Sequence, residues 1–355
     1  MKKYFITIIF LAFAPLPIKL QADNHTEDQH RKIQQIQNLV HQDLMTGDVE
    51  HARNRLDEAA SNFHSEEIEL TMIQTLMQAG EYRHALSAAA HTQAEHQDSF
   101  DTTLLYAWLL AAGGQMQPAK NLILSSLEKN QHPTLVAMLT QINGGQLDSR
   151  SFKPKSIQLG PVTDTTLTAE YKLLANGVFI NTRHVITSRA SLAERKNFLI
   201  RNGAGRIFKG SIDETFIDPY LARLTLENSA PIIDISQTVD KTPFPGVPIY
   251  TVGFTNNGLP QWPQLSIDIL GSPIEGDDNL YSLNSKNLDY GTGIYSLAGT
   301  LIGVVVSDRA NTRKVRMLVN ELIRDDAKKE RQHRLPVDQF YEKAFQNTAQ
   351  LFSDN

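Results

Sequence analysis

Three glycines in the first half of the chain recur at a nearly constant interval, and this interval restricts the first half to a row of similar helical units. Gly80 follows Gly47 by 33 residues, and Gly114 follows Gly80 by 34. Glycine allows the left-handed backbone of a tight turn between antiparallel helices, and alanine lets crossing helices approach closely. An alanine lies five residues after each glycine, at Ala52, Ala85 and Ala119. The pattern therefore predicts three helical hairpins.

A period of about 34 residues with these two features resembles the tetratricopeptide repeat. The aromatic and proline positions of that family's consensus are mostly missing here, so an ordinary helical bundle is the alternative. The resemblance implies a surface for peptides or partner proteins and no chemistry of its own. We expect this helical-repeat domain to span residues 23–143.

The first 22 residues have the layout of a secretory signal peptide. Lys2 and Lys3 precede an apolar run over residues 4–14, and the small residue Ala22 stands before Asp23. The alternative is a membrane anchor, but the run is shorter than the roughly 20 residues of a spanning helix. No cysteine follows it for lipid attachment. The sequence predicts a periplasmic or secreted protein that is cut near Ala22 and has no stable membrane insertion.

Charge and residue usage exclude several classes of function. Residues 23–150 hold 17 acidic and 8 basic residues, while residues 151–355 hold 22 and 23. Nucleic acids and anionic lipids favour basic patches, so we expect a protein or peptide partner and no nucleic acid. The chain has no cysteine, which excludes disulfides and thiolate nucleophiles. It also lacks phosphate-binding glycine motifs and His-Glu-x-x-His, so we expect no cofactor and no metal.

After a polar, Gly- and Pro-containing linker at residues 144–161, helical periodicity gives way to short strands. Many short strands without intervening helices are typical of a sandwich or barrel. A helical pattern over Val315, Leu318, Val319, Leu322 and Ile323 then closes this domain. A terminal amphipathic helix is expected over residues 326–355. The predicted strands are Gly177–Asn181, Val185–Thr187, Phe198–Arg201, Ile207–Ser211, Leu221–Leu226, Ile249–Phe254, Gln264–Leu270, Leu280–Leu283 and Thr300–Val306.

Four motifs of the second half resemble, in the right order, the strand motifs of trypsin-like peptidases. They are Asn176-Gly177-Val178-Phe179-Ile180 with His184-Val185-Ile186-Thr187, then Leu221-Ala222-Arg223-Leu224, then the segment from Pro245 to Phe254, and then Gly291-Thr292-Gly293 with Gly299 to Val304. The resemblance covers residues 162–325 and implies a double β-barrel, with an unrelated sandwich as the alternative. The predicted fold class is therefore multidomain α + β, with an N-terminal α-helical repeat domain before an all-β trypsin-like double barrel and C-terminal helices.

The positions that this resemblance assigns to catalysis do not carry a serine–histidine–aspartate triad. Ala190 stands at the histidine position, Tyr220 at the aspartate position and Tyr290 at the nucleophile position. A hydroxyl group without a positioned base is not activated at neutral pH. Three nearby residues could rebuild a site, namely His184, Asp218 and Thr292.

These observations predict an exported, non-catalytic protein-binding or scaffold protein, in which an inactive barrel cleft holds an extended peptide by strand addition. The alternative is an active serine- or threonine-type endopeptidase that uses Thr292 and His184. That alternative requires a histidine within hydrogen-bond reach of a hydroxyl group at the barrel junction. A third possibility, assembly through the repeats alone, predicts a cleft filled by the protein's own side chains.

Overall fold

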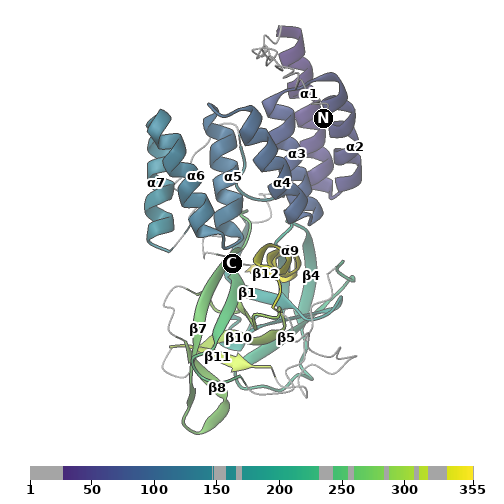
Figure 1. The fold of residues 1–355 in the computed structure, drawn as a ribbon. Helices are drawn as coiled ribbons and strands as arrows, with labels where there is room; N and C mark the ends of the chain where they lie inside the picture. Colours follow the sequence, from purple (N-terminus) through teal and green to yellow (C-terminus); the bar gives the residue numbers. More distant parts are fainter. Residues whose placement is uncertain are drawn as a thin grey trace, which may run out of the picture.

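The computed structural model has a helical half that lies above a β half (Figure 1). The structure describes residues 27–145, 147, 157–164, 170–231, 243–254, 260–283, 288–307, 312–318 and 334–354. Within these ranges no helix has both the length and the apolar content needed to cross a membrane. The predicted order of a helical domain followed by an all-β domain is confirmed.

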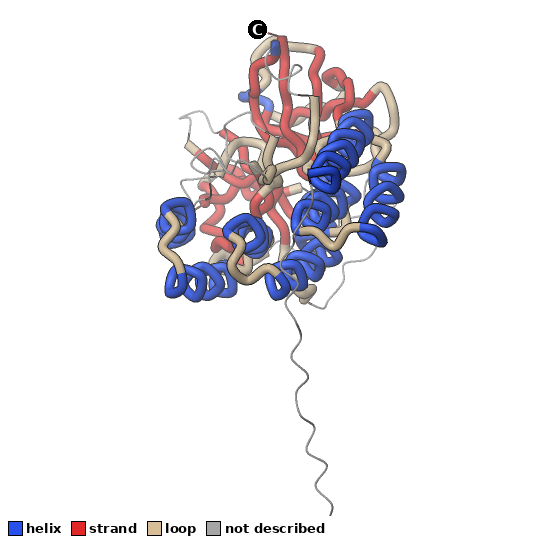
Figure 2. Tube along the Cα trace, turned by 90° about the horizontal axis from the view of Figure 1, so that it is seen from above, coloured by secondary structure: helices blue, strands red, loops and turns tan. Residues whose placement is uncertain are grey.

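Seven α-helices form the described part of the first half, and each contacts the next along the chain. Seen from above, they make a curved row (Figure 2). Serine side chains start two of them, because Ser65 accepts a hydrogen bond from the Ile68 N–H and Ser99 accepts one from the Thr102 N–H. The helices are α1 (Glu27–Thr46), α2 (Val49–Asn62), α3 (Glu66–Ala79), α4 (Tyr82–Glu95), α5 (Phe100–Ala112), α6 (Met116–Lys129) and α7 (Pro133–Asn143).

The regularly spaced glycines and alanines have the conformations that their spacing predicts. Gly47, Gly80 and Gly114 lie in the turns after α1, α3 and α5, with φ of 83°, 91° and 80°. These values belong to the left-handed region of backbone conformation, which is unfavourable for residues that have a Cβ atom. The three alanines are fully buried in α2, α4 and α6, at Ala52, Ala85 and Ala119.

The described residues of the second half form two closed antiparallel barrels of six strands each, which confirms the predicted double barrel. The first contains β1 (Tyr171–Phe179), β2 (His184–Ser188), β3 (Asn197–Asn202), β4 (Ile207–Ile212), β5 (Leu221–Leu226) and β12 (Thr348–Asp354). The second contains β6 (Pro248–Gly253), β7 (Gln264–Ile274), β8 (Asp277–Leu283), β9 (Gly293–Tyr295), β10 (Leu301–Ser307) and β11 (Arg313–Met317). The short strand β9 and the strands β11 and β12 were not expected from the sequence.

The last strand of the chain closes the first barrel. Around that barrel the strands follow the order β12-β1-β2-β5-β4-β3, and around the second barrel the order β6-β7-β8-β11-β10-β9. The two barrels therefore have the same strand order when β12 counts as the first strand of its barrel. In this position β12 pairs with β1 on one side and with β3 on the other. The first barrel is incomplete without the C-terminus.

The expectation of a terminal helix over residues 326–355 is therefore only partly right. The helix α9 spans Val337–Asn347 and ends where β12 begins. Leu351 and Phe352 continue the helical spacing of α9 in the sequence, yet they lie in the strand. Pairing on both edges of β12 satisfies its backbone groups and outweighs the helical pattern.

A second helical expectation is also wrong where the structure describes it. Val315 lies in β11, where its side chain is fully buried in the second barrel, rather than in a helix. Leu318 follows that strand as a buried residue outside any helix. The remaining residues of the pattern lie outside the described residues, at Val319, Leu322 and Ile323.

The described C-terminal end of the predicted linker packs against the helices. Ile157 and Leu159 are each 6% exposed and join the core that contains α3, α5 and α7. Gln78 of α3 holds Val162 by both main-chain groups, because its Oε1 accepts from the Val162 N–H and its Nε2 donates to the Val162 carbonyl, each at 2.9 Å. This segment joins the helical half to the first barrel.

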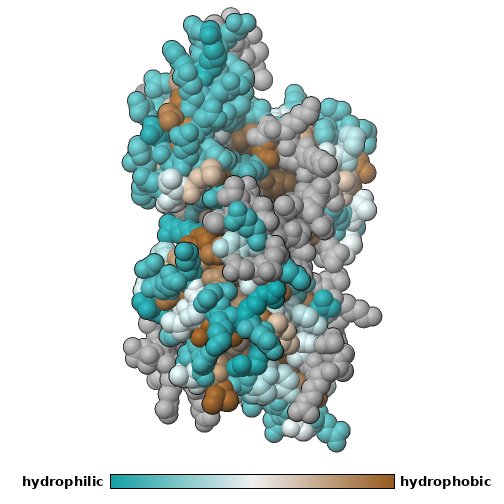
Figure 3. Space-filling model, turned by 180° about the vertical axis from the view of Figure 1, so that it is seen from behind, coloured by the Kyte–Doolittle hydropathy of each residue, from teal (hydrophilic) through white to brown (hydrophobic). Residues whose placement is uncertain are grey.

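Helix α9 is the second connection between the two halves. Tyr341 packs edge-on against Tyr82 of α4 and donates a hydrogen bond to the Pro263 carbonyl at 2.6 Å. Gln346 donates to the Gly80 carbonyl at 3.0 Å, in the turn between α3 and α4. Seen from behind, hydrophobic side chains are visible where the helical row meets the barrels (Figure 3). The last helix thus ties the helical half to the barrels.

Candidate functional site at the barrel junction

The residue aligned with the catalytic histidine of trypsin-like peptidases lies just after β2 and carries no acid–base group. Ala190 is exposed in a short 3₁₀ helix, Arg189–Ser191. Its neighbour Arg189 fixes this helix to the loop before β5. Arg189 Nε donates to the carbonyls of Asp218 at 2.9 Å and Leu221 at 3.0 Å, and Arg189 Nη2 donates to the Phe216 carbonyl at 3.2 Å. The methyl group of Ala190 can neither accept nor donate a proton.

Asp218 is the carboxylate closest in sequence to the acid position, which Tyr220 occupies. Its Oδ1 accepts from the main-chain N–H groups of Tyr220 at 2.8 Å and Leu221 at 2.9 Å. Its Oδ2 accepts from Arg316 Nε at 3.1 Å and Nη2 at 2.9 Å. Arg316 comes from β11 of the other barrel and also contacts Asp277 of β8 at 3.2 Å. Oδ1 of Asp218 therefore holds the start of β5, and Oδ2 takes part in a buried connection between the barrels.

Thr292, the candidate hydroxyl nucleophile, is 1% exposed and hydrogen-bonded to an amide instead of a base. Asn176 of β1 donates from Nδ2 to Thr292 Oγ1 at 3.0 Å, and from the same nitrogen to the Phe254 carbonyl at 3.2 Å. Gly291 has a φ of 85°, and a Cβ atom there would overlap the Asn176 carbonyl. The loop before β9 is therefore packed closely onto β1.

His184, the candidate base, lies at the other end of β2. Its Nδ1 is 3.1 Å from Asn181 Oδ1, and its side chain is partly exposed. Thr187 lies three residues further along β2 and donates to the Asn176 carbonyl at 2.6 Å. Three residues of strand span about 10 Å, so His184 is separated from the Asn176–Thr292 pair by that length of β2. The structure does not bring His184 and Thr292 together.

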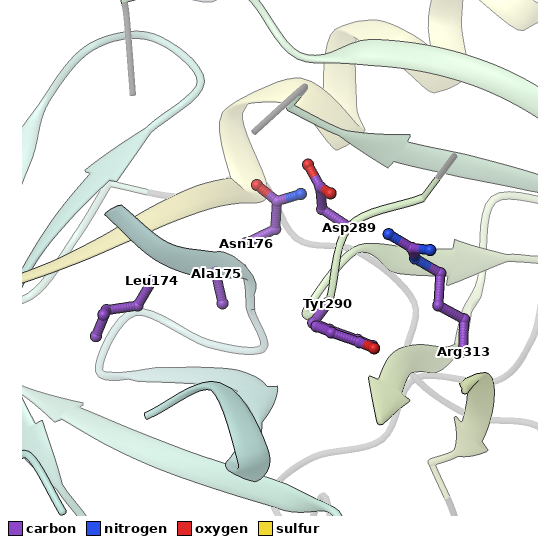
Figure 4. Close-up of a pocket in the computed structure, with 6 residues that line it drawn as sticks. All are labelled: Leu174, Ala175, Asn176, Asp289, Tyr290 and Arg313. Atoms are coloured by element: carbon purple, nitrogen blue, oxygen red, sulfur yellow. The ribbon is translucent and has the colours of Figure 1, made fainter. Parts of the chain in front are cut away.

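Tyr290, at the nucleophile position, forms one wall of a pocket at the junction (Figure 4). The Arg313 guanidinium lies over the Tyr290 ring, 5.5 Å from its centroid. The pocket holds about 340 Å³ of space, which includes open solvent. Its lining residues are Leu174, Ala175, Asn176, Asp289, Tyr290 and Arg313.

The roles of two residues that organise this junction were not predicted from the sequence. Asn176 begins the first strand motif but matches no catalytic position, and Arg316 lies in a segment whose apolar spacing predicts a helix. In the described ranges, no group of three or more histidine, aspartate or glutamate side chains could hold a metal ion. The junction therefore offers hydrogen-bonding groups and an ion pair.

No family model matches the chain, and no curated protein is similar to it in sequence. Among solved structures, the Rv3671c protease of M. tuberculosis in its active form is 16% identical, with a TM-score of 0.32 over 43% of this chain and 79% of that chain. Its inactive form is 17% identical, with a TM-score of 0.33 over 43% of this chain and 86% of that chain. Kallikrein-related peptidase 10 in complex with Zn²⁺ is 15% identical, with a TM-score of 0.30 over 42% and 85%.

Proposed function

We propose that the protein is an exported, non-catalytic binding or scaffold protein, built from a tetratricopeptide-like helical row and an inactive trypsin-like double barrel. The observation that carries this proposal is the state of Asp218. A triad needs a carboxylate that orients a histidine, and a histidine that takes the proton of the nucleophile. Here the Asp218 carboxylate is held by Arg316 and two main-chain N–H groups.

The other two positions support the same conclusion. Ala190 provides no base, and Thr292 accepts a hydrogen bond from an amide that cannot take its proton. The rearranged site that an active endopeptidase would need requires His184 beside Thr292, and these residues lie apart. Unmodified hydroxyl groups at this junction are therefore weak nucleophiles at neutral pH.

A casein digestion assay tests the absence of catalysis, with Thr292→Ala as the matched control. We expect no cleavage by either protein. Cleavage by the wild type that disappears in Thr292→Ala would show that Thr292 is activated by a group that this account does not include.

Two further measurements test export and binding. N-terminal sequencing of the protein from a periplasmic fraction is expected to start near Asp23, whereas intact Met1 in a membrane fraction would contradict export. A pull-down from periplasm with the full-length protein is expected to retain a specific protein partner. If nothing is retained beyond a bait-free control, the binding function is wrong.

A further inference from the structure

The junction pocket contains a buried hydrogen-bond donor that the described residues leave unused. Within the part of the chain that the structure describes, Arg313 Nε is buried and has no hydrogen-bond partner, and the Arg313 guanidinium lies over the Tyr290 ring. A buried N–H without an acceptor is unfavourable, and the great majority of such groups in folded proteins are paired. The arrangement is therefore suited to a ligand that brings an acceptor oxygen into the pocket.

Asn176 provides the matching acceptor from β1. Its Nδ2 donates to Phe254 and Thr292, which fixes the orientation of the carboxamide group. Its main-chain N–H donates to the Tyr290 carbonyl at 2.9 Å, and its own carbonyl accepts from Thr187. Because Nδ2 and both main-chain groups of Asn176 already form hydrogen bonds, its side-chain Oδ1 is the atom that can accept a hydrogen bond from a ligand.

The charges of the pocket favour a neutral ligand over an ion. Arg313 brings one positive charge and Asp289 one negative charge, and both residues line the pocket (Figure 4). An anionic group would be repelled by Asp289, and a cationic group by Arg313. The ring of Tyr290 and the side chain of Leu174 add an apolar surface. An amide group meets all of these conditions, since it is neutral and carries an acceptor oxygen next to a donor nitrogen.

We propose that this pocket binds an amide group of an extended peptide, whose carbonyl oxygen accepts from Arg313 Nε and whose N–H donates to Asn176 Oδ1. The amide comes either from the peptide backbone or from a glutamine or asparagine side chain. This inference rests on the proposed binding function, for which it names the chemistry of the partner. It assigns peptide recognition to the place where the resemblance puts the nucleophile.

The test is a calorimetric titration of the full-length protein with four N-acetylated pentapeptides. Each has alanine at all positions except the central one, which is glutamine, leucine, glutamate or lysine. Equal binding of all four peptides identifies a backbone amide as the ligand, and preferred binding of the glutamine peptide identifies a side-chain amide. Tighter binding of the glutamate or lysine peptide, or no binding of any of them, would overturn the proposal.

Arg313→Met is the key variant, because methionine keeps an unbranched apolar chain beside Tyr290 and removes the donor. Loss of a hydrogen bond from a charged donor should lower the peptide affinity roughly 10- to 100-fold. Lys196→Met, at an exposed position of the first barrel, is the matched control and should bind like the wild type. If Arg313→Met does not fold, Arg313→Leu replaces it, with the same loss expected because leucine has no hydrogen-bond donor. Unchanged affinity in the folded Arg313 variant would overturn the proposal.

This experiment separates the inference from the function on which it rests. Hydrolysis of a pentapeptide by the wild type would contradict the non-catalytic function. Intact peptides that fail to bind would contradict only the assignment of this pocket.

Discussion

Removal of the Arg316 guanidinium should destabilise the junction between the barrels, because it leaves Asp218 as a buried carboxylate without a counterion. The Asp218 side chain is 2% exposed and that of Arg316 is 11% exposed. Arg316→Met removes both hydrogen bonds to Asp218 Oδ2. Breaking a buried ion pair by removing one partner costs about 3–5 kcal/mol. Because Oδ1 keeps its two main-chain donors, we expect a loss near the lower limit, about 3 kcal/mol.

Urea unfolding, followed by circular dichroism, measures this loss against a matched surface pair. Lys196 and Glu214 form an ion pair of 2.9 Å whose side chains are 74% and 71% exposed. Solvent screens such a pair, so Lys196→Met should leave the urea midpoint unchanged. A shift for Arg316→Met no larger than that for Lys196→Met would refute the reasoning.

A double variant separates the unpaired charge from the loss of packing. Asp218→Asn/Arg316→Met removes both charges, while the carboxamide oxygen introduced at this position can still accept from the two main-chain N–H groups. We expect it to be more stable than Arg316→Met alone, because no carboxylate is then buried without a partner. Equal stability of the two variants would show that lost packing, and not the charge, causes the effect.

Two further variants and one change of conditions test other parts of the structure. Gly80→Val should lose about 1–3 kcal/mol of stability, because φ is 91° and the Gln346 side chain fills the space of a Cβ atom; unchanged thermal unfolding would contradict this. Deletion of residues 348–354 should leave one edge of β1 and one edge of β3 unpaired and the protein insoluble, and a soluble chain with the wild-type circular dichroism spectrum would show that the first barrel closes without β12. Burial raises the pKa of three tyrosine hydroxyl groups, so the unfolded chain loses these protons at a lower pH than the folded chain does. The contribution of these groups to the stability of the fold is therefore fully present below about pH 10 and should be lost as the pH rises further. The urea midpoint between pH 8 and 11 measures this, and a constant midpoint would contradict it. The tyrosines are Tyr82, Tyr295 and Tyr341.

The features that the sequence predicts well are those determined by local backbone chemistry. Gly47, Gly80 and Gly114 mark turns because a left-handed φ requires glycine, whatever the rest of the fold does. The nine predicted strands are found because short runs of branched and aromatic residues between turn residues favour extended backbone. Periodicity and turn residues therefore locate most elements of both halves.

The features that the sequence does not predict depend on contacts between distant segments. Leu351 and Phe352 fit a continued helix, and only the free edges of β1 and β3 explain why they form a strand. The linker is polar on average, yet Ile157 and Leu159 are buried because the helices offer them an apolar surface. The Asp218–Arg316 pair joins residues 98 positions apart, and neither residue lies in a motif that would reveal it.

The central claim is that this double barrel has no activated nucleophile, and labelling with a fluorophosphonate probe tests it most directly. Such a probe reacts with a hydroxyl group that a base within hydrogen-bond reach, about 3 Å, has activated. The full-length wild type, Thr292→Ala and Ala190→His should all remain unlabelled while keeping a folded circular dichroism spectrum. Ala190→His should stay silent because Arg316 already holds the Asp218 carboxylate that would orient the new imidazole. Labelling of the wild type that is lost in Thr292→Ala would contradict the claim.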